Sequence, residues 1–210
     1  MANLETIREG ILTGDIETVV RGCNALLESG MPPLEIINDG LIAGMNVVGK
    51  KFKVGDMFMP EVLMSARAMG AGIEIVKPLI AEEDVPTAGK VVIGTVEGDL
   101  HDIGKNLVVI MLESSGYDVV NLGVDIPPQG FVEAVKQHKP DILGLSALLT
   151  TTMLAMKETL DVLKEAGVRE GLKVIVGGAP VTADFAEEIG ADGYAPDGPA
   201  AVELADRLLA

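Results

Sequence analysis

Cysteine and aromatic residues are scarce in this chain of 210 residues. Cys23 is the only cysteine, so one chain cannot form a disulfide or a thiolate cluster, which fits the reducing cytoplasm. Cys23 lies in an apolar pattern of helical spacing, and we expect a small buried side chain there and not a nucleophile. Aromatic residues make up 3% of the chain and glycines number 25, which is typical of an α/β protein with an aliphatic core and closely packed helices.

Basic residues are also few. Lys and Arg number 16 against 32 Asp and Glu, so the net charge is −16. Phosphate backbones and anionic membrane surfaces repel such a chain, and we expect neither nucleic acid nor membrane as a partner. The charge favours solubility and docking to a basic protein surface.

Long apolar runs are missing as well. None reaches the roughly 20 residues that span a bilayer. Residues 1–10 (MANLETIREG) lack the basic and apolar regions of a signal peptide. We therefore expect a cytoplasmic protein.

The first eighty residues predict helices only. Apolar residues recur at helical spacing over 4–12, 16–27, 34–48 and 63–80. Gly14 and Gly30 end the first two patterns, and prolines open the last two. Four amphipathic helices with short loops predict a four-helix bundle over residues 1–82. The acidic, then Pro- and Gly-containing segment 83–89 is the expected linker.

The pattern changes from residue 90 onward. Short β-branched apolar runs alternate with helical stretches, which predicts a doubly wound, flavodoxin- or Rossmann-like α/β domain over residues 90–210. Ligands bind such sheets beyond the carboxyl ends of the strands. The five strands of the predicted parallel sheet are 90–96, 118–122, 141–147, 173–177 and, more weakly, 193–195.

The loop after the first predicted strand, GDLHDIGKN, contains Asp99 and His101. An imidazole can bind a transition metal through one nitrogen, while a carboxylate two residues away accepts a hydrogen bond from the other. A surface histidine without a ligand is the other interpretation. One histidine with scattered carboxylates cannot form a closed zinc site, so a metal here would arrive in a cofactor that brings most of its own ligands.

Small residues end the third and fourth predicted strands, Ser146 and the pair Gly177-Gly178. Gly104, at the start of a predicted helix, would let a bulky ligand approach the backbone. Together these residues predict a deep slot beside the histidine. Ordinary turn formation is the alternative for the two adjacent glycines.

In combination these segments resemble the cobalamin-binding signature. Methionine synthase, several B12 mutases and the small corrinoid proteins of anaerobic methyltransferase systems share that signature. The pattern is Asp99-x-His101-x-x-Gly104, then Ser146-x-Leu148 after 41 intervening residues, then Gly177-Gly178 after 28 more.

The helical part is similar to the cap found on the methyl-transfer branch of that family. The similar segments are residues 44–52 (GMNVVGKKF), residues 56–63 (DMFMPEVL) and Ser65-Ala66. The resemblance therefore covers essentially the whole chain. It is closest to the two-domain corrinoid proteins that serve methanol, methylamine, betaine or methoxy-aromatic methyltransferases.

The resemblance implies a role for each matching residue. His101 would be the lower axial ligand of the corrinoid cobalt, in place of the cofactor's own base. Asp99 would accept a hydrogen bond from His101, and Ser146 would extend this proton relay. Asp102 would either contact the cofactor or only cap a helix. The residues expected to bind the cofactor are Gly98, Asp99, His101, Asp102, Ile103, Gly104, Ser146, Leu148, Gly177, Gly178, Phe58, Met59 and Leu63.

The implied function is that of a non-catalytic methyl carrier. The cofactor would be cobalamin or a related corrinoid, whose cobalt cycles between Co(I) and methyl-Co(III). The partners would be a substrate-specific methyltransferase, a second, acceptor methyltransferase and a reductive activator. Phe58, Met59 and Leu63 would cover the methyl-bearing face of the cofactor until a movement of the bundle exposes it. Membership of the bundle core is the alternative for these three residues.

Three other functions compete with the carrier. A B12 sensor or storage module would bind the cofactor without turnover, but such regulators normally carry a DNA-binding domain, and no basic helix-turn-helix segment is present. The small subunit of an adenosylcobalamin mutase would not need a helical cap. A phosphoacceptor domain using Asp99 or Asp102 would leave the Ser-x-Leu and Gly-Gly spacings unexplained.

Overall fold

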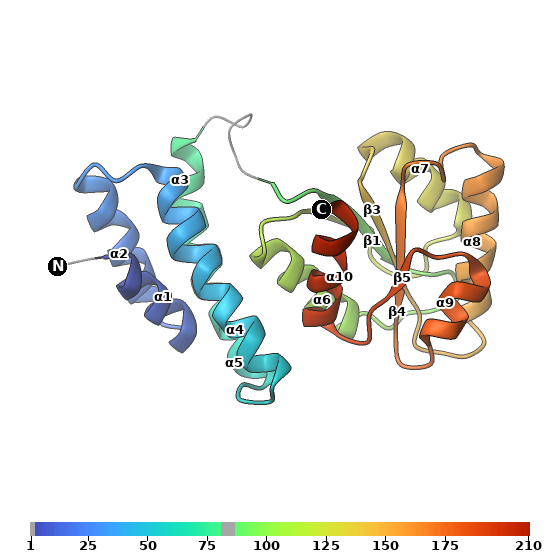
Figure 1. Ribbon diagram of the computed structural model, residues 1–210, viewed down its shortest axis with the longest axis horizontal. Helices are drawn as coiled ribbons and strands as arrows, with labels where there is room; N and C mark the ends of the chain where they lie inside the picture. Colours follow the sequence, from blue (N-terminus) through green and yellow to red (C-terminus); the bar gives the residue numbers. More distant parts are fainter. Residues whose placement is uncertain (1–2, 81–86) are drawn as a thin grey trace. The chain divides into compact units, whose positions relative to one another are not determined.

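The computed structural model describes residues 3–80 and 87–210. They form two units, a helical one made almost entirely of the residues before the gap and an α/β one made of residues after it (Figure 1). The predicted linker, 83–89, lies mostly outside the described residues. Its last residue, Gly89, already belongs to the sheet region, because its carbonyl oxygen accepts a hydrogen bond from the Asp118 N–H at 3.0 Å.

Within residues 3–80 the chain forms four helices, as the sequence predicts. Gly14, with φ of 68°, ends the first of them in the left-handed conformation. The Asp15 carboxylate then caps the second by accepting from the Thr18 N–H at 3.0 Å. The helices are α1 (Leu4–Thr13), α2 (Ile16–Glu28), a continuous helix over residues 33–53, and α5 (Met59–Val76), which runs into the 3₁₀ turn η2 (Lys77–Leu79).

The third helix contains a π-helical segment that the sequence pattern does not reveal. It begins as α3 (Pro33–Glu35), continues as the π-helix η1 (Ile36–Ile42) and ends as α4 (Ala43–Lys53). The Asp39 carbonyl oxygen in this segment accepts a hydrogen bond from Nε of Arg8 at 2.7 Å. That donor lies on α1, 31 residues away, so helical periodicity does not indicate this contact.

Cys23 lies in α2 and is fully buried, as the apolar pattern predicts. Burial raises the pKa of its thiol from 9.0 to about 11. We expect iodoacetamide at pH 8 to alkylate the native chain at least about 100-fold more slowly than the unfolded chain, because the thiolate is the nucleophile. Mass spectrometry of both states measures this, and equal rates would contradict the burial.

The raised pKa of the Cys23 thiol also makes the stability of the folded chain depend on pH. The folded state keeps the Cys23 proton at pH values where the unfolded state releases it. The free energy of unfolding is therefore expected to fall as the pH rises from 9.0 to about 11.

The second unit contains one parallel five-stranded sheet, as predicted. Its strand order is β2-β1-β3-β4-β5, the flavodoxin-like order, so the direction of winding reverses between β1 and β3. Adjacent strands keep a regular register, with Val92 opposite Leu143 and Gly144 opposite Ile175. The strands are β1 (Lys90–Thr95), β2 (Asp118–Asn121), β3 (Ile142–Ser146), β4 (Lys173–Gly177) and β5 (Gly193–Tyr194).

Helices cover both faces of this sheet (Figure 1). Successive strand residues point to opposite faces, so Val92 packs with Phe131 of α7, whereas Val91 packs with Leu112 of α6. Helices α7, α8 and α9 cover the first face, and α6 and α10 cover the second. Among the described helices, none is both long and apolar enough to cross a membrane. The helices are α6 (Ile103–Ser114), α7 (Pro128–His138), α8 (Met153–Glu165), α9 (Ala183–Ile189) and α10 (Gly198–Leu209).

Candidate functional site

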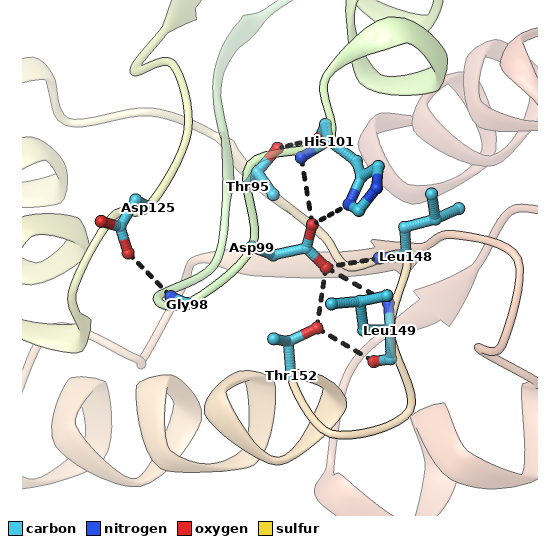
Figure 2. A network of polar contacts seen from close by, with 8 residues as sticks. All are labelled: Thr95, Gly98, Asp99, His101, Asp125, Leu148, Leu149 and Thr152. Carbon is cyan, nitrogen blue, oxygen red and sulfur yellow. Dashed lines mark hydrogen bonds and ion pairs between the residues drawn. The ribbon is translucent and has the colours of Figure 1, made fainter.

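The predicted site residues converge at the carboxyl ends of β1 and β3. These neighbouring strands flank the point where the winding of the sheet reverses, which is where ligands bind open α/β sheets. The loop after β1 carries Asp99 and His101, and the loop after β3 carries Leu148 and Thr152 (Figure 2). The topology therefore brings together two segments that are about fifty residues apart in the sequence.

Asp99 and His101 form the contact at the centre of the site. Oδ1 of Asp99 lies 2.7 Å from Nδ1 of His101, and it also accepts a hydrogen bond from the His101 backbone N–H at 3.1 Å (Figure 2). Asp99 is fully buried, whereas 51% of the His101 side chain is exposed. The buried carboxylate thus binds one ring nitrogen of an imidazole that is itself about half-exposed.

The second carboxylate oxygen of Asp99 is bound by the β3–α8 loop. Oδ2 accepts hydrogen bonds from the Leu148 N–H at 2.7 Å, the Leu149 N–H at 3.2 Å and the Thr152 hydroxyl at 2.7 Å. Both oxygens of the buried carboxylate are therefore satisfied, which is what an ionised group away from water requires.

These contacts keep Asp99 ionised. Burial raises the pKa of its carboxyl group, but the hydrogen bonds from Thr152, Leu148 and His101 together lower it well below the ordinary value of 3.8. An ionised carboxylate only accepts hydrogen bonds, so Nδ1 of His101 carries a proton. In the neutral imidazole, Nε2 then carries the lone pair and is the potential metal ligand.

The hydroxyl group that contacts Asp99 belongs to Thr152 and not to Ser146, through which we expected the relay to extend. Ser146 ends β3, half-buried, and its carbonyl oxygen accepts from the Val96 N–H at 3.0 Å. Three threonines follow Leu149 in the sequence, but the sequence does not show which of them turns toward Asp99. The turn at the start of α8 selects Thr152, because its hydroxyl reaches both Asp99 and the Leu149 carbonyl oxygen.

We expect the substitution Thr152→Val to lower the free energy of unfolding by about 2 kcal/mol, since it removes a buried donor to a charged group. Thr152→Ser retains the hydroxyl and should behave like the wild type. Urea denaturation of the full chain measures both variants. A larger loss in Ser146→Ala than in Thr152→Val would show instead that Ser146 supports Asp99.

Exposed apolar side chains flank His101. Leu100 is 71% exposed and Ile103 is 83% exposed, and Leu148 also projects into solvent although its backbone binds Asp99. A group of apolar side chains this exposed is uncommon on a soluble protein and typically marks a binding surface. Across residues 3–80 and 87–210, no three His, Cys, Asp or Glu side chains lie close enough together to hold a metal ion.

The predicted glycines fall into two groups. A Cβ atom at Gly104 would meet no other atom within 4 Å, so the space beside the start of α6 is open. A Cβ atom at Gly178 would lie 1.8 Å from the Ala147 carbonyl oxygen, and one at Gly177 would lie 2.8 Å from the Ala195 carbonyl oxygen. The two adjacent glycines are thus required by the packing of neighbouring backbones, whatever they also do for a ligand.

Two further predicted residues lie in the β1–α6 loop. Gly98 has φ of 80°, a conformation that favours glycine. Asp102 directly precedes α6, and its side chain accepts from the Asn106 amide group at 2.9 Å. The structure thus places Asp102 at the start of the helix, and a contact with a cofactor stays a prediction.

The predicted residues of the helical unit differ in exposure. Phe58 is 69% exposed, so it does not belong to the core of the bundle. Met59 and Leu63 are half-buried. Phe58 precedes α5, where the Glu61 carboxylate accepts from its backbone N–H at 2.8 Å and fixes the start of the helix.

Sequence comparisons relate both units to known proteins. The family model described as B12 binding domain matches residues 89–204, and a second model with that description matches residues 4–77. A corrinoid protein of Desulfitobacterium hafniense is 43% identical over 212 residues, which cover 100% of this chain and 98% of the relative. The trimethylamine corrinoid protein of Methanosarcina barkeri is 46% identical over 200 residues, 92% of each chain.

A solved structure extends the similarity to three dimensions. One chain in the crystal structure of the methanol:cobalamin methyltransferase complex MtaBC from Methanosarcina barkeri matches with a TM-score of 0.90 and 39% identity. The match covers 98% of this chain and 79% of that chain. The similarity therefore concerns the whole chain and not the sheet alone.

Proposed function

This chain belongs to the corrinoid proteins with a B12-binding domain, and from that premise we propose that it carries a methyl group between two methyltransferases on the cobalt of a bound corrinoid. The observation that carries the proposal is the contact of the accessible His101 with the buried Asp99 at 2.7 Å. When bound, the corrinoid supplies the metal centre that takes up and releases the methyl group.

The residues around His101 fit a corrinoid. Such a cofactor brings the equatorial ligands of its metal, so the protein needs to supply only one axial nitrogen, and Nε2 of His101 is available for it. The exposed side chains of Leu100 and Ile103 offer apolar surface to a large ring. The open space at Gly104 leaves room beside the backbone.

Asp99 and Thr152 prepare His101 for this role. Asp99 holds the Nδ1 proton, which orients the imidazole and makes Nε2 a better donor to a metal. The Thr152 hydroxyl has one proton and two acceptors within reach, Asp99 at 2.7 Å and the Leu149 carbonyl oxygen at 2.9 Å. The hydroxyl proton can turn from Asp99 to the Leu149 carbonyl oxygen if the pair of Asp99 and His101 gains a proton. Since His101 would take the place of the cofactor's own base, cobalamin and cobamides with other bases should both bind.

The helical unit has a role of its own in this proposal. The exposed phenyl ring of Phe58 supports the prediction that this unit covers the methyl-bearing face of the cofactor between transfers. The partners would be two methyltransferases and a reductive activator, and the net charge of −16 favours partner surfaces that are basic. The crystal structure of MtaBC shows a similar chain in complex with a methyltransferase.

Two alternatives are distinguishable from the carrier. A phosphoacceptor role for Asp99 is disfavoured because the carboxylate is fully buried and both of its oxygens accept hydrogen bonds. A B12-binding sensor or storage module would use the same residues but would accept no methyl group.

The test is methyl transfer to the loaded chain. The full chain, loaded with cobalamin and reduced, is mixed with isotopically labelled methanol or methylamines and the corresponding methyltransferases, then gel-filtered. Label recovered on the corrinoid bound to the chain, with at least one of these substrates, supports the carrier. A chain that retains corrinoid but takes up no label from any of them is a binding module without turnover. A chain that retains no corrinoid overturns the proposal.

A further inference from the structure

Asp125 is an exposed residue in the loop after β2 and is not one of the predicted site residues. Its φ is 56°, in the left-handed region that disfavours residues with a side chain, although Asp and Asn adopt it more readily than most. Among the described residues, the other non-glycine residue with positive φ is Lys139, which ends α7, where a left-handed residue is ordinary. Asp125 therefore needs a separate explanation.

Two hydrogen bonds join Asp125 to the turn that carries Asp99. Oδ1 of Asp125 accepts from the Gly98 N–H at 2.7 Å, and the Asp125 N–H donates to the Asp99 carbonyl oxygen at 3.1 Å. The side chain and the backbone of one residue thus hold two consecutive residues of the neighbouring loop. Figure 2 shows Asp125 on the side of this turn opposite to the His101 imidazole.

The turn itself is short and depends on such support. The Asp99 N–H donates to the Val96 carbonyl oxygen at 3.2 Å, and Gly98 lies between them with φ of 80°. The loop after β2 runs beside it, because the Ile126 N–H donates to the Thr95 carbonyl oxygen at 3.0 Å. Asp125 is the residue of that loop whose side chain reaches across to the turn.

We propose that Asp125 is a positioning residue for the metal ligand: by holding Gly98 and Asp99 in place, it sets the position of the Asp99 carboxylate and, through it, of Nε2 of His101. The inference rests on the proposed function, since it assigns His101 to a cobalt ion. The left-handed backbone turns both hydrogen-bonding groups of Asp125 toward the same turn, and this explains why an aspartate stands where glycine would be less strained.

Three variants distinguish the effect of the Asp125 carboxylate from the effect of its left-handed backbone conformation. Asp125→Gly keeps the left-handed conformation and removes the acceptor for Gly98. Asp125→Asn keeps an oxygen acceptor and tolerates the conformation. Lys139→Gly is the matched control, because it relieves a left-handed residue outside the loops of the site.

The first measurement uses the full chain without corrinoid. The ¹⁵N NMR shifts of the His101 ring report whether Nδ1 holds its proton, and hydrogen exchange reports the protection of the Gly98 amide. We expect Asp125→Gly to move the ring shifts toward those of a mixture of tautomers, with Asp125→Asn and Lys139→Gly unchanged. The second measurement is hydroxocobalamin binding, for which we expect the Kd to rise on the order of 10-fold in Asp125→Gly alone.

The outcomes are decisive in either direction. Unchanged His101 shifts and an unchanged Kd in Asp125→Gly overturn the proposal, and so does an equal loss in Lys139→Gly. If Asp125→Gly does not fold, fast exchange of the Gly98 amide in the folded wild type overturns it, whereas slow exchange in the wild type that persists in Asp125→Asn supports it. A wild type that binds no corrinoid would refute the proposed function, while the NMR shifts of the chain alone would still test Asp125.

Discussion

Replacing His101 with alanine is expected to abolish the nitrogen coupling in the Co(II) EPR spectrum of the loaded chain and to reduce methyl transfer by more than about 100-fold. Loss of a group that merely orients a metal-binding histidine typically costs 10- to 100-fold, so loss of the ligand itself should cost more.

The chain offers a matched control for this substitution. His138, at the end of α7, is the only other histidine in the sequence. His138→Ala should retain both the nitrogen coupling and methyl transfer, and labelling with ¹⁵N-histidine should change the coupling of the wild type and of His138→Ala alike. A loaded His101→Ala chain with the wild-type spectrum would show that the cobalt ligand is not His101.

Replacing Gly178 with alanine is expected to destabilise the α/β unit by more than about 4 kcal/mol, a loss that few single substitutions reach. The new Cβ atom would lie 1.8 Å from the Ala147 carbonyl oxygen, and the φ of 129° at this position is one that side chains avoid. Neither backbone can move away freely, because the Ala147 N–H donates to the Gly177 carbonyl oxygen at 3.2 Å. Urea denaturation without corrinoid measures the effect.

Gly104 provides the contrasting case. Alanine fits there without any contact within 4 Å and lies in the first turn of α6, so Gly104→Ala should fold as well as the wild type or better by about 0.5–1 kcal/mol. If the open space admits the corrinoid, the same variant should bind it more weakly. Normal stability of Gly178→Ala would refute the steric argument, and a destabilised Gly104→Ala would show that this glycine serves the fold as well.

Much of the fold could be predicted because its pattern is local. Alternation of β-branched runs with amphipathic stretches gave five parallel strands, and the strand ends agree with the predicted ranges to within a few residues. The π-helical segment Ile36–Ile42 was not predicted, because the apolar residues of 34–48 have ordinary helical spacing.

The site, too, combines a local contact that the sequence predicts with contacts between distant residues that it does not. The spacing of Asp99 and His101 suffices to predict their contact, since a carboxylate two residues away can reach the imidazole within one loop. The remaining supports of Asp99 come from two other loops. Thr152 lies 53 residues away, and the partner of Gly98, Asp125, lies 27 residues away, so their contribution depends on how neighbouring strands end.

The sequence by itself determined the fold class and the contact between Asp99 and His101, because hydrophobic periodicity and a short loop act over a few residues. Only the tertiary structure decided which hydroxyl group supports Asp99, why Gly178 must be glycine, and that Asp125 holds the turn. The physical reason is that buried polar groups and close backbone contacts are satisfied across the sheet, by residues whose distance along the chain says nothing about their distance in space.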